Sequence, residues 1–272
     1  MKRARSGREA GARRLGPLAT CAVLLLPGVS AAAVTLHLDA ESRFDTAPAL
    51  RLTASNMGDE AAHDAVPEVL FQHRTYLGER ATLAPGARRE WLLSLAAPRD
   101  RGTFPAIVRV RFADAHGERG STPLVTLVRT PDATPSPVSA SLRLEPLAGA
   151  ASGELRLENA GLRPVAGRLA VILPDALHTY PESQPVEVAA RGRAMVPLVI
   201  QDAGARPGGQ YPLFAVLEYT EDGAHHAALA AGTVSVAGNP TRGRVPLLVG
   251  LLALSASLAL LAVAWRRAAR RG

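Results

Sequence analysis

The chain has 272 residues, of which 47% are hydrophobic and 20% charged, so it is not a disordered chain and suffices for one large domain or two of ordinary size. Its formal net charge of +7 arises at the two ends, because six basic residues precede residue 15 and four follow residue 265. Between the ends, 21 basic residues face 23 acidic ones, and aromatic residues make up only 4% of the chain. Both observations argue against a nucleic-acid-binding protein.

Residues 1–33 have the order of a secretory signal peptide: a basic start, an apolar stretch from Leu15 to Leu26, and small residues before a cleavage site after Ala31 or Ala33. An uncleaved signal anchor is the alternative, and the proline that interrupts the short apolar run argues against it. Cys21 lies in a poor lipobox, because a threonine precedes it and the apolar stretch continues past it. Cleavage would remove Cys21, the only cysteine, and leave a mature chain without disulfides.

Two segments of similar sequence follow, at residues 34–130 and 140–238. The motif "LRL" at Leu50 recurs at Leu155, an offset of 105, and Leu83–Leu95 aligns with Val188–Ile200 at the same offset. "GTFPAIVRVRF" from Gly102 matches "GQYPLFAVLEY" from Gly209 at an offset of 107. A period near 105 residues predicts two copies of one domain.

Each copy shows the period-two alternation of β-strands, as in Trp91, Leu93 and Leu95, which we expect to face a core. The Asn-x-Gly triplets at Asn56 and Asn159 predict turns. About 100 residues with short strands and frequent turns predict an all-β protein of two tandem Ig-like β-sandwiches. The Pro-rich residues 131–139 between the copies predict a semi-extended spacer.

Residues 246–265 are uncharged and long enough to cross a bilayer as a helix. Trp265 stands where an interfacial aromatic residue is expected, and a basic tail at residues 266–272 predicts a cytoplasmic end. The flanking charge argues against a buried globular helix, and residues 239–245 form a short juxtamembrane spacer. The residues of this membrane flank are Trp265, Arg266, Arg267, Arg270 and Arg271.

We find no catalytic motif of the GxSxG, GxGxxG, P-loop or HExxH type, and predict no catalytic residue, cofactor or metal site. His225 and His226 are neighbours that would point to opposite faces of a strand; we expect a loop pair without a ligand. Asp114, Glu221 and Asp222 stand beside glycines and predict turn chemistry, since neither loop has the six to eight oxygens of a calcium site. Residues 99–101 predict a solvated charged tip.

The "NxG", "LxPG" and "GxYPxxxxxxY" motifs, ending in acidic-glycine turns, resemble bacterial extracellular Ig-like modules of the α-galactosidase-associated NEW-type and CARDB adhesion-type. The resemblance covers about residues 34–130 and 140–238. It implies a scaffold or binding role and transfers no catalytic residues. The second copy departs from it at Ala189–Gly192, where the Pro-Gly pair is missing, so we expect a different turn there.

These features predict a non-enzymatic interaction or scaffold protein, anchored by one helix in the bacterial cytoplasmic membrane, with its modules on the extracytoplasmic side and contacting other envelope proteins. The alternative is a carbohydrate-binding accessory protein of envelope polysaccharide assembly or export. For that role Tyr76, expected to be partly exposed, is the candidate ligand contact. A hydrolase with an unrecognised site is a third hypothesis, and it requires a cleft with converging ionisable groups.

Overall fold

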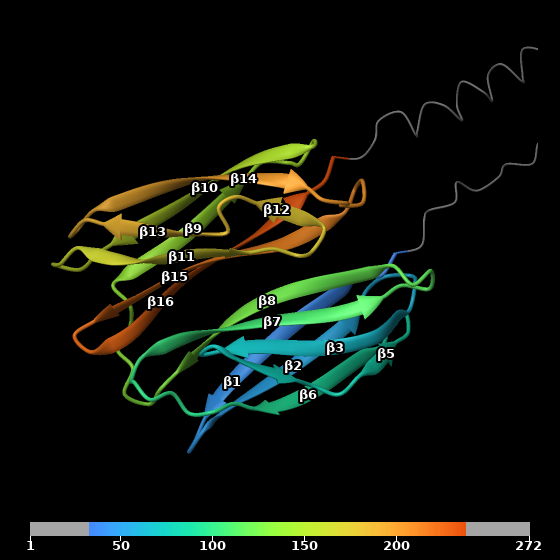
Figure 1. Cartoon of the computed structure of the whole chain (residues 1–272), viewed down its shortest axis with the longest axis horizontal. Helices are drawn as coiled ribbons and strands as arrows, with labels where there is room; N and C mark the ends of the chain where they lie inside the picture. The colour runs from blue at the N-terminus through green and yellow to red at the C-terminus, as the bar shows by residue number, and fades with distance from the viewer. Residues whose placement is uncertain (1–32, 238–272) are drawn as a thin grey trace, which may run out of the picture. The chain divides into compact units, whose positions relative to one another are not determined.

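The computed structural model describes residues 33–237, and every regular element among them is a β-strand (Figure 1). No helix in this part of the chain is long and apolar enough to span a bilayer. The expected signal peptide covers residues 1–33, and all of it except Ala33 lies outside the described range. The expected helix at 246–265 and its flanking residues also lie outside it. The all-β class is therefore confirmed for residues 33–237.

Strands β1 to β8 form the N-terminal sandwich, in which one sheet has the order β1-β2-β6 and the other β4-β3-β7-β8, with β5 also paired to β3. Leu50, Leu52, Phe71 and Val108 are among the fully buried residues between these sheets, and Trp91 is 5% exposed, so its predicted core position is confirmed. The strands are β1 (Leu36–Phe44), β2 (Pro48–Asn56), β3 (Ala62–Phe71), β4 (Arg74–Leu77), β5 (Ala81–Leu83), β6 (Arg88–Ser94), β7 (Thr103–Ala113) and β8 (Arg119–Arg129).

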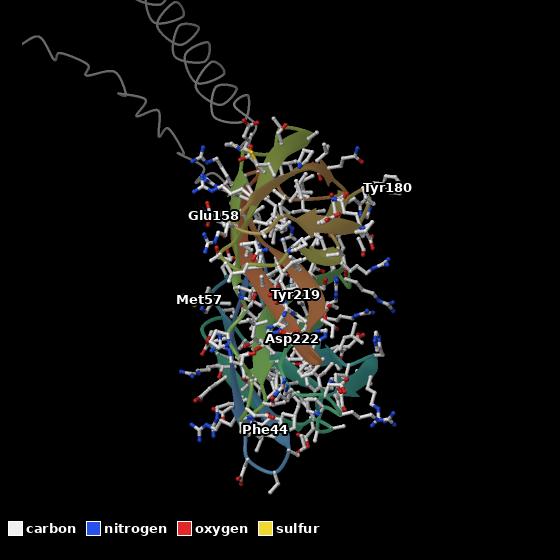
Figure 2. All side chains as sticks on the ribbon, turned by 90° about the vertical axis from the view of Figure 1, so that its left-hand side faces the viewer. Phe44, Met57, Glu158, Tyr180, Tyr219 and Asp222 are labelled. Carbon is white, nitrogen blue, oxygen red and sulfur yellow. The ribbon has the colours of Figure 1, made fainter. Side chains whose placement is uncertain are left out.

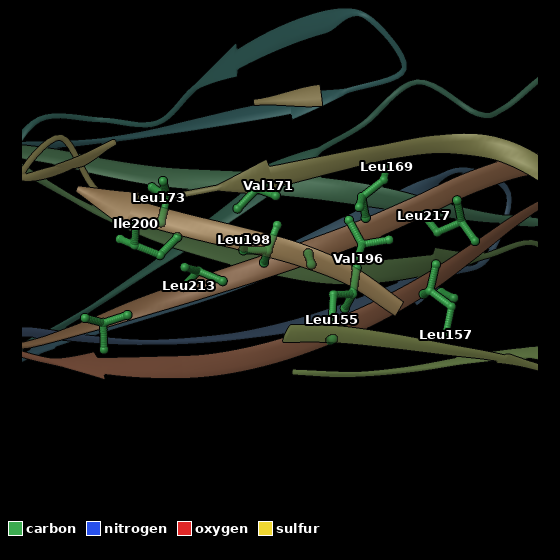
Figure 3. Close-up of a cluster of buried hydrophobic side chains, with 14 of the residues drawn as sticks. Leu155, Leu157, Leu169, Val171, Leu173, Val196, Leu198, Ile200, Leu213 and Leu217 are labelled. Carbon is green, nitrogen blue, oxygen red and sulfur yellow. The ribbon is translucent and has the colours of Figure 1, made fainter. Parts of the chain in front are cut away.

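Strands β9 to β16 form the C-terminal sandwich, with sheets ordered β12-β14-β10-β9 and β13-β11-β15-β16. Its core contains Leu155, Leu169, Ile200 and Leu217, which project between the sheets from four different strands (Figure 3). The strands are β9 (Val138–Leu144), β10 (Ala150–Asn159), β11 (Val165–Ile172), β12 (Leu177–Thr179), β13 (Ser183–Val188), β14 (Arg193–Asp202), β15 (Gln210–Glu221) and β16 (Ala224–Ser235).

The strand pairing corrects one part of the repeat alignment. Leu52 is opposite Trp91, and Leu155 is opposite Val196, the residue that corresponds to Trp91 at an offset of 105. Leu155 therefore corresponds to Leu52, at an offset of 103, and the expected match with Leu50 is wrong by two residues. A shift of two keeps every side chain on its own face of the sheet, so the alternating pattern did not reveal it.

The turn at Ala189–Gly192 also differs from expectation, because it is the same turn as in the first copy. Ala87 N–H donates to Ala84 O at 2.9 Å, and Gly192 N–H donates to Ala189 O at 3.0 Å. Arg191 takes the left-handed conformation, with φ of 50°, where the first copy has Gly86 with φ of 74°. The turn is retained although its glycine is lost.

A third apolar cluster joins the two sandwiches. Val125 of β8 packs in it with Ile172, Phe214, Val216 and Ala227 of the C-terminal sandwich, and all five are at most 7% exposed. Strands β7 and β8 thus present one face to their own core and the other to β15 and β16. The Pro-rich segment that precedes β9 therefore connects two sandwiches in direct contact.

Candidate functional site

A cleft of about 430 Å³ lies where β3 and β7 of the N-terminal sandwich meet the segment after β11. Leu70, Ile107 and Ile172 contribute apolar surface to it, and Leu70 is 42% exposed. Charged and titratable side chains also line it: Glu68, Arg109, Asp175, His178 and Glu182. Pockets with apolar walls and a few polar groups are the usual binding sites of proteins.

Two residues that line this cleft, Arg109 and Asp175, form an ion pair between the sandwiches. Arg109 Nη1 lies 2.7 Å from Asp175 Oδ1 and also donates to Ser121 Oγ at 3.2 Å, while the Asp175 N–H donates to the same Ser121 Oγ at 3.4 Å. The Arg109 side chain is 26% exposed and that of Asp175 is 59% exposed, so water reaches this ion pair from the Asp175 side. Asp175 lies 66 residues later in the chain, so no local pattern in the sequence indicated this partner.

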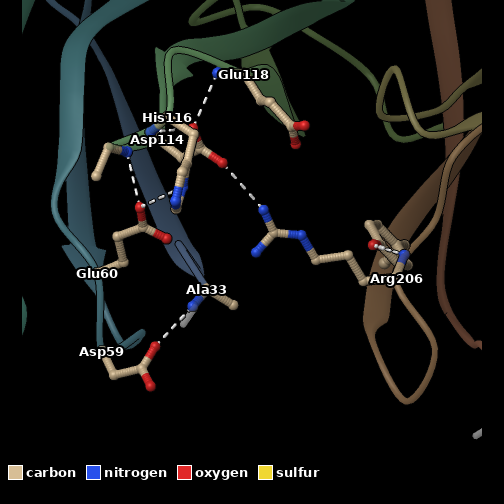
Figure 4. Close-up of polar contacts among 9 residues, drawn as sticks. Ala33, Asp59, Glu60, Asp114, His116, Glu118 and Arg206 are labelled. Atoms are coloured by element: carbon tan, nitrogen blue, oxygen red, sulfur yellow. Dashed lines mark hydrogen bonds and ion pairs between the residues drawn. The ribbon is translucent and has the colours of Figure 1, made fainter. Parts of the chain in front are cut away.

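A second ion pair joins Arg206 to Asp114 at 3.1 Å, between the β14–β15 and β7–β8 connections (Figure 4). Asp114 Oδ1 accepts the N–H groups of His116 and Glu118, both at 2.9 Å, so its predicted role as a turn residue is confirmed. Burial raises the pKa of Asp114, but these N–H groups and the positive charges of His116 and Arg206 outweigh it and hold the pKa below its ordinary value.

Glu60 is a partner of this turn that the sequence did not reveal, because it lies more than 50 residues earlier, between β2 and β3. Its Oε1 accepts the Ala115 N–H at 2.7 Å and lies 3.8 Å from His116 Nδ1 (Figure 4). Glu60, Asp114 and His116 are close enough to ligate one cation. However, both oxygens of Asp114 already accept protein donors, so a cation would have to displace them. We interpret the contacts of these three residues as structural: they hold the β7–β8 turn in its conformation.

His225 and His226 lie on β16, so the expectation of a loop pair is wrong, whereas their predicted opposite orientation is confirmed. The His225 ring stacks on Phe104 of the N-terminal sandwich, with ring centroids 4.6 Å apart, and its Nε2 lies 3.0 Å from Glu218 Oε2. The buried His226 ring stacks on Tyr219 at 5.1 Å, and its Nδ1 has no hydrogen-bond partner in the part of the chain that the structure describes. His225 therefore contacts the N-terminal sandwich, whereas His226 packs on its cross-strand neighbour within the C-terminal sandwich.

The burial of His226 lowers the pKa of its imidazole below the ordinary value of 6.5. The nearby positive charge of His225 acts in the same direction, while the carboxylates of Glu221 and Asp222 act to raise the pKa. Burial is the largest of these effects, so folding favours the neutral form of the ring over the charged form.

Residues 99–101 are all exposed, as expected of a solvated tip, but Arg101 also contacts the C-terminal sandwich. Its Nη2 donates to the Asp222 carbonyl oxygen at 3.2 Å, and its own carbonyl accepts the His225 N–H at 2.9 Å. Gly102 follows with φ of 139° and forms a parallel bridge with His225. A Cβ at this position would collide with the His225 backbone, so the close approach requires glycine.

Tyr76 is partly buried, as expected, but it packs against the N-terminal core, and its hydroxyl accepts the Ala96 N–H at 3.0 Å. Part of the residue remains exposed, and its role as a ligand contact stays a prediction. Tyr180 is 94% exposed, and its side chain points away from the ribbon in Figure 2. It lies two residues from both His178 and Glu182 of the cleft, and nothing in the sequence distinguished it.

No known protein family matches the sequence, and no curated protein matches it either. Among solved structures, the chain is similar to red sea bream transglutaminase, at 14% identity over 76% of this chain and 31% of that one, with a TM-score of 0.29. It is also similar to Escherichia coli alpha-2-macroglobulin, at 10% identity over 75% and 17% of the chains, with a TM-score of 0.33. A protein of unknown function from Porphyromonas gingivalis W83 shares 16% identity over 74% and 99% of the chains, with a TM-score of 0.30.

The chain spans less than a third of the transglutaminase and of the macroglobulin. At these TM-scores the similarities assign neither a family nor an activity to it.

Proposed function

We propose that this chain is a non-enzymatic, single-pass membrane protein whose two Ig-like modules bind another envelope protein on the extracytoplasmic side. The observation that carries the proposal is the cleft that both sandwiches line, with apolar residues such as Leu70 and Ile107 beside charged ones. Protein interfaces have this composition, with an apolar centre and a polar rim.

The contacts between the sandwiches support this role, because a binding surface that is already ordered loses less entropy when a partner binds. Phe214 and Val125 pack in the shared apolar cluster, and Arg109 pairs with Asp175 at the side of the cleft. We expect these contacts to hold the cleft in one shape before a partner binds.

A photo-crosslinking amino acid at position 70 of the full-length chain in intact cells tests the proposal. We expect it to capture one envelope protein, whereas the same amino acid at position 162, which is also exposed, does not. Leu70→Glu should abolish co-purification of that protein, and Leu162→Glu should leave it unchanged. No captured protein at position 70, or equal capture at both positions, contradicts the proposal.

The membrane topology needs a separate test. We expect protease to digest residues 34–238 in spheroplasts and to leave them intact in inside-out vesicles, since the basic tail at residues 266–272 favours the cytoplasmic side. The opposite protection pattern contradicts both the orientation and the extracytoplasmic role.

Carbohydrate binding is the second candidate, and the exposed ring of Tyr180 near the cleft favours it. A glycan array probed with the detergent-solubilised chain should then show binding that Tyr180→Ala removes. Because Tyr180 is almost fully exposed, this substitution leaves the fold intact, whereas Tyr76→Ala removes core contacts. An array without a positive glycan excludes this candidate.

A further inference from the structure

Strand β6 ends its sheet, and among residues 33–237 only β2 is hydrogen-bonded to it, along one of its two edges (Figure 1). At one end of the β2–β6 ladder the Leu95 N–H donates to the Pro48 carbonyl, and at the other end the Asn56 N–H donates to the Ala87 carbonyl. These two bonds show which backbone groups of β6 point toward β2. Bonded pairs alternate along antiparallel strands. The backbone groups that point away from β2 therefore belong to Arg88, Glu90, Leu92 and Ser94.

The equivalent edge of the C-terminal sandwich is obstructed. Pro197 of β14 corresponds to Leu92 at an offset of 105, and by the same alternation it faces the free edge, where proline has no N–H to donate. Strand β12 also pairs with the end of β14, at Ile200 to Asp202. Of these two matching edges, only that of β6 offers an uninterrupted row of donors and acceptors.

The side chains along β6 indicate what an added strand would carry. Leu92 is 69% exposed and points to the outer face. Glu90 already pairs with Arg51 at 2.8 Å, and Arg89 pairs with Glu79 at 3.3 Å. Within residues 33–237, the exposed Arg88 has no carboxylate within ion-pair distance.

We propose that the β6 edge binds an extended segment of the partner protein by antiparallel strand addition. The segment has an apolar residue beside Leu92 and an acidic residue four positions later, beside Arg88, since residues four apart share a face. The seven residues of β6 extend over about 20 Å at the usual strand rise, which matches a segment of similar length. This inference rests on the proposed function and names the chemistry of its partner.

A second copy of the chain satisfies these side chains less well. Antiparallel self-pairing brings an acid to Arg88 only when Glu90 of the other copy faces it, and Glu90 already pairs with Arg51. The same register places Gly86 opposite Leu92, beyond the start of β6. A partner segment can satisfy both positions in one register.

Two nine-residue Thr/Val peptides, with valine at position 3 and either glutamate or lysine at position 7, serve as probes for the purified full-length chain in detergent. Fluorescence anisotropy should show the glutamate peptide binding at least about threefold more tightly, because an exposed ion pair adds a modest attraction and the lysine of the other peptide is repelled by Arg88. Arg88→Glu should reverse this preference. Equal binding of both peptides, or a preference unchanged by Arg88→Glu, overturns the proposal.

Leu92→Pro tests the backbone contribution, because it reproduces Pro197 and removes one edge N–H without touching the bonds to β2. We expect it to abolish peptide binding and crosslinking from position 94 in cells, while Leu92→Ala, which keeps the N–H, retains part of both. Crosslinking at position 70 should persist in Leu92→Pro, so failure at the edge is distinguishable from failure of the cleft. Unchanged binding by Leu92→Pro, or a crosslink from position 94 to a second copy of this chain, overturns the proposal.

Discussion

Asn56 and Asn159 hold the same corner in the two sandwiches. The side-chain Nδ2 of each donates at 2.7 Å to the carbonyl oxygen four residues later, at Glu60 and at Arg163. Each Oδ1 accepts the N–H of the residue two positions later, at 3.0 Å in the first copy and 2.8 Å in the second. The buried side-chain amide of each asparagine thus supplies hydrogen bonds to backbone groups at the point where the chain leaves the sheet and strand pairing ends.

Replacing Asn56 or Asn159 by alanine should lower the free energy of unfolding by about 2–4 kcal/mol, because buried carbonyl oxygens lose their donor. Urea denaturation measures the loss. Ser139→Ala, at an exposed strand position, is the control and should change stability by less than about 0.5 kcal/mol. An asparagine variant as stable as this control contradicts the assigned role.

Arg191→Gly should stabilise the C-terminal sandwich by about 0.5–1 kcal/mol. Arg191 is held at φ of 50°, a conformation that is unfavourable for a residue with a Cβ, and glycine removes that cost. The matched substitution Gly86→Ala should destabilise the N-terminal sandwich by about 1 kcal/mol, although a Cβ there meets no other atom. Opposite signs in urea denaturation are the expected result, and equal signs refute the equivalence of the two turns.

Stability should depend on pH through His226. Since its pKa is lowered in the folded protein, the unfolded chain binds a proton more readily as the pH falls below 6.5. The stability that the neutral ring contributes is fully present above pH 6.5. It is lost as the pH falls from 6.5 through the lowered pKa. At still lower pH, His226 causes no further change in stability.

In His226→Phe this decline should disappear between about pH 8 and pH 5, and His37→Gln, at an exposed position, should keep it. Urea midpoints across that range measure the difference from the unsubstituted protein. An identical pH dependence in His226→Phe shows that other groups are responsible.

Gly102→Ala should loosen the contact between the sandwiches, since the new Cβ meets the His225 backbone. We expect a loss of about 1–3 kcal/mol and faster proteolysis within residues 131–137. Gly117→Ala is the matched control: Gly117 also has positive φ, but the space around it is open, so only the conformational cost applies. The idea fails if both variants resist protease equally.

The sequence determined the elements of this protein that depend on neighbours along the chain. Alternation of apolar and polar residues predicted the strands and the core position of Trp91, and matching phrases predicted the repeat, because period-two geometry links each side chain to one face of a sheet. The turn role of Asp114 was also predictable, since its partners His116 and Glu118 are two and four residues away.

Only the tertiary structure decided the candidate site. Arg109 and Asp175 are 66 residues apart and belong to different sandwiches, and their contact depends on how β7 and β8 pack against the second copy. The outer faces of those strands carry apolar residues such as Val125, which local alternation cannot assign to one of two cores. Likewise, the free edge beside Leu92 follows from strand order, which arises from pairings between distant segments and not from any local pattern.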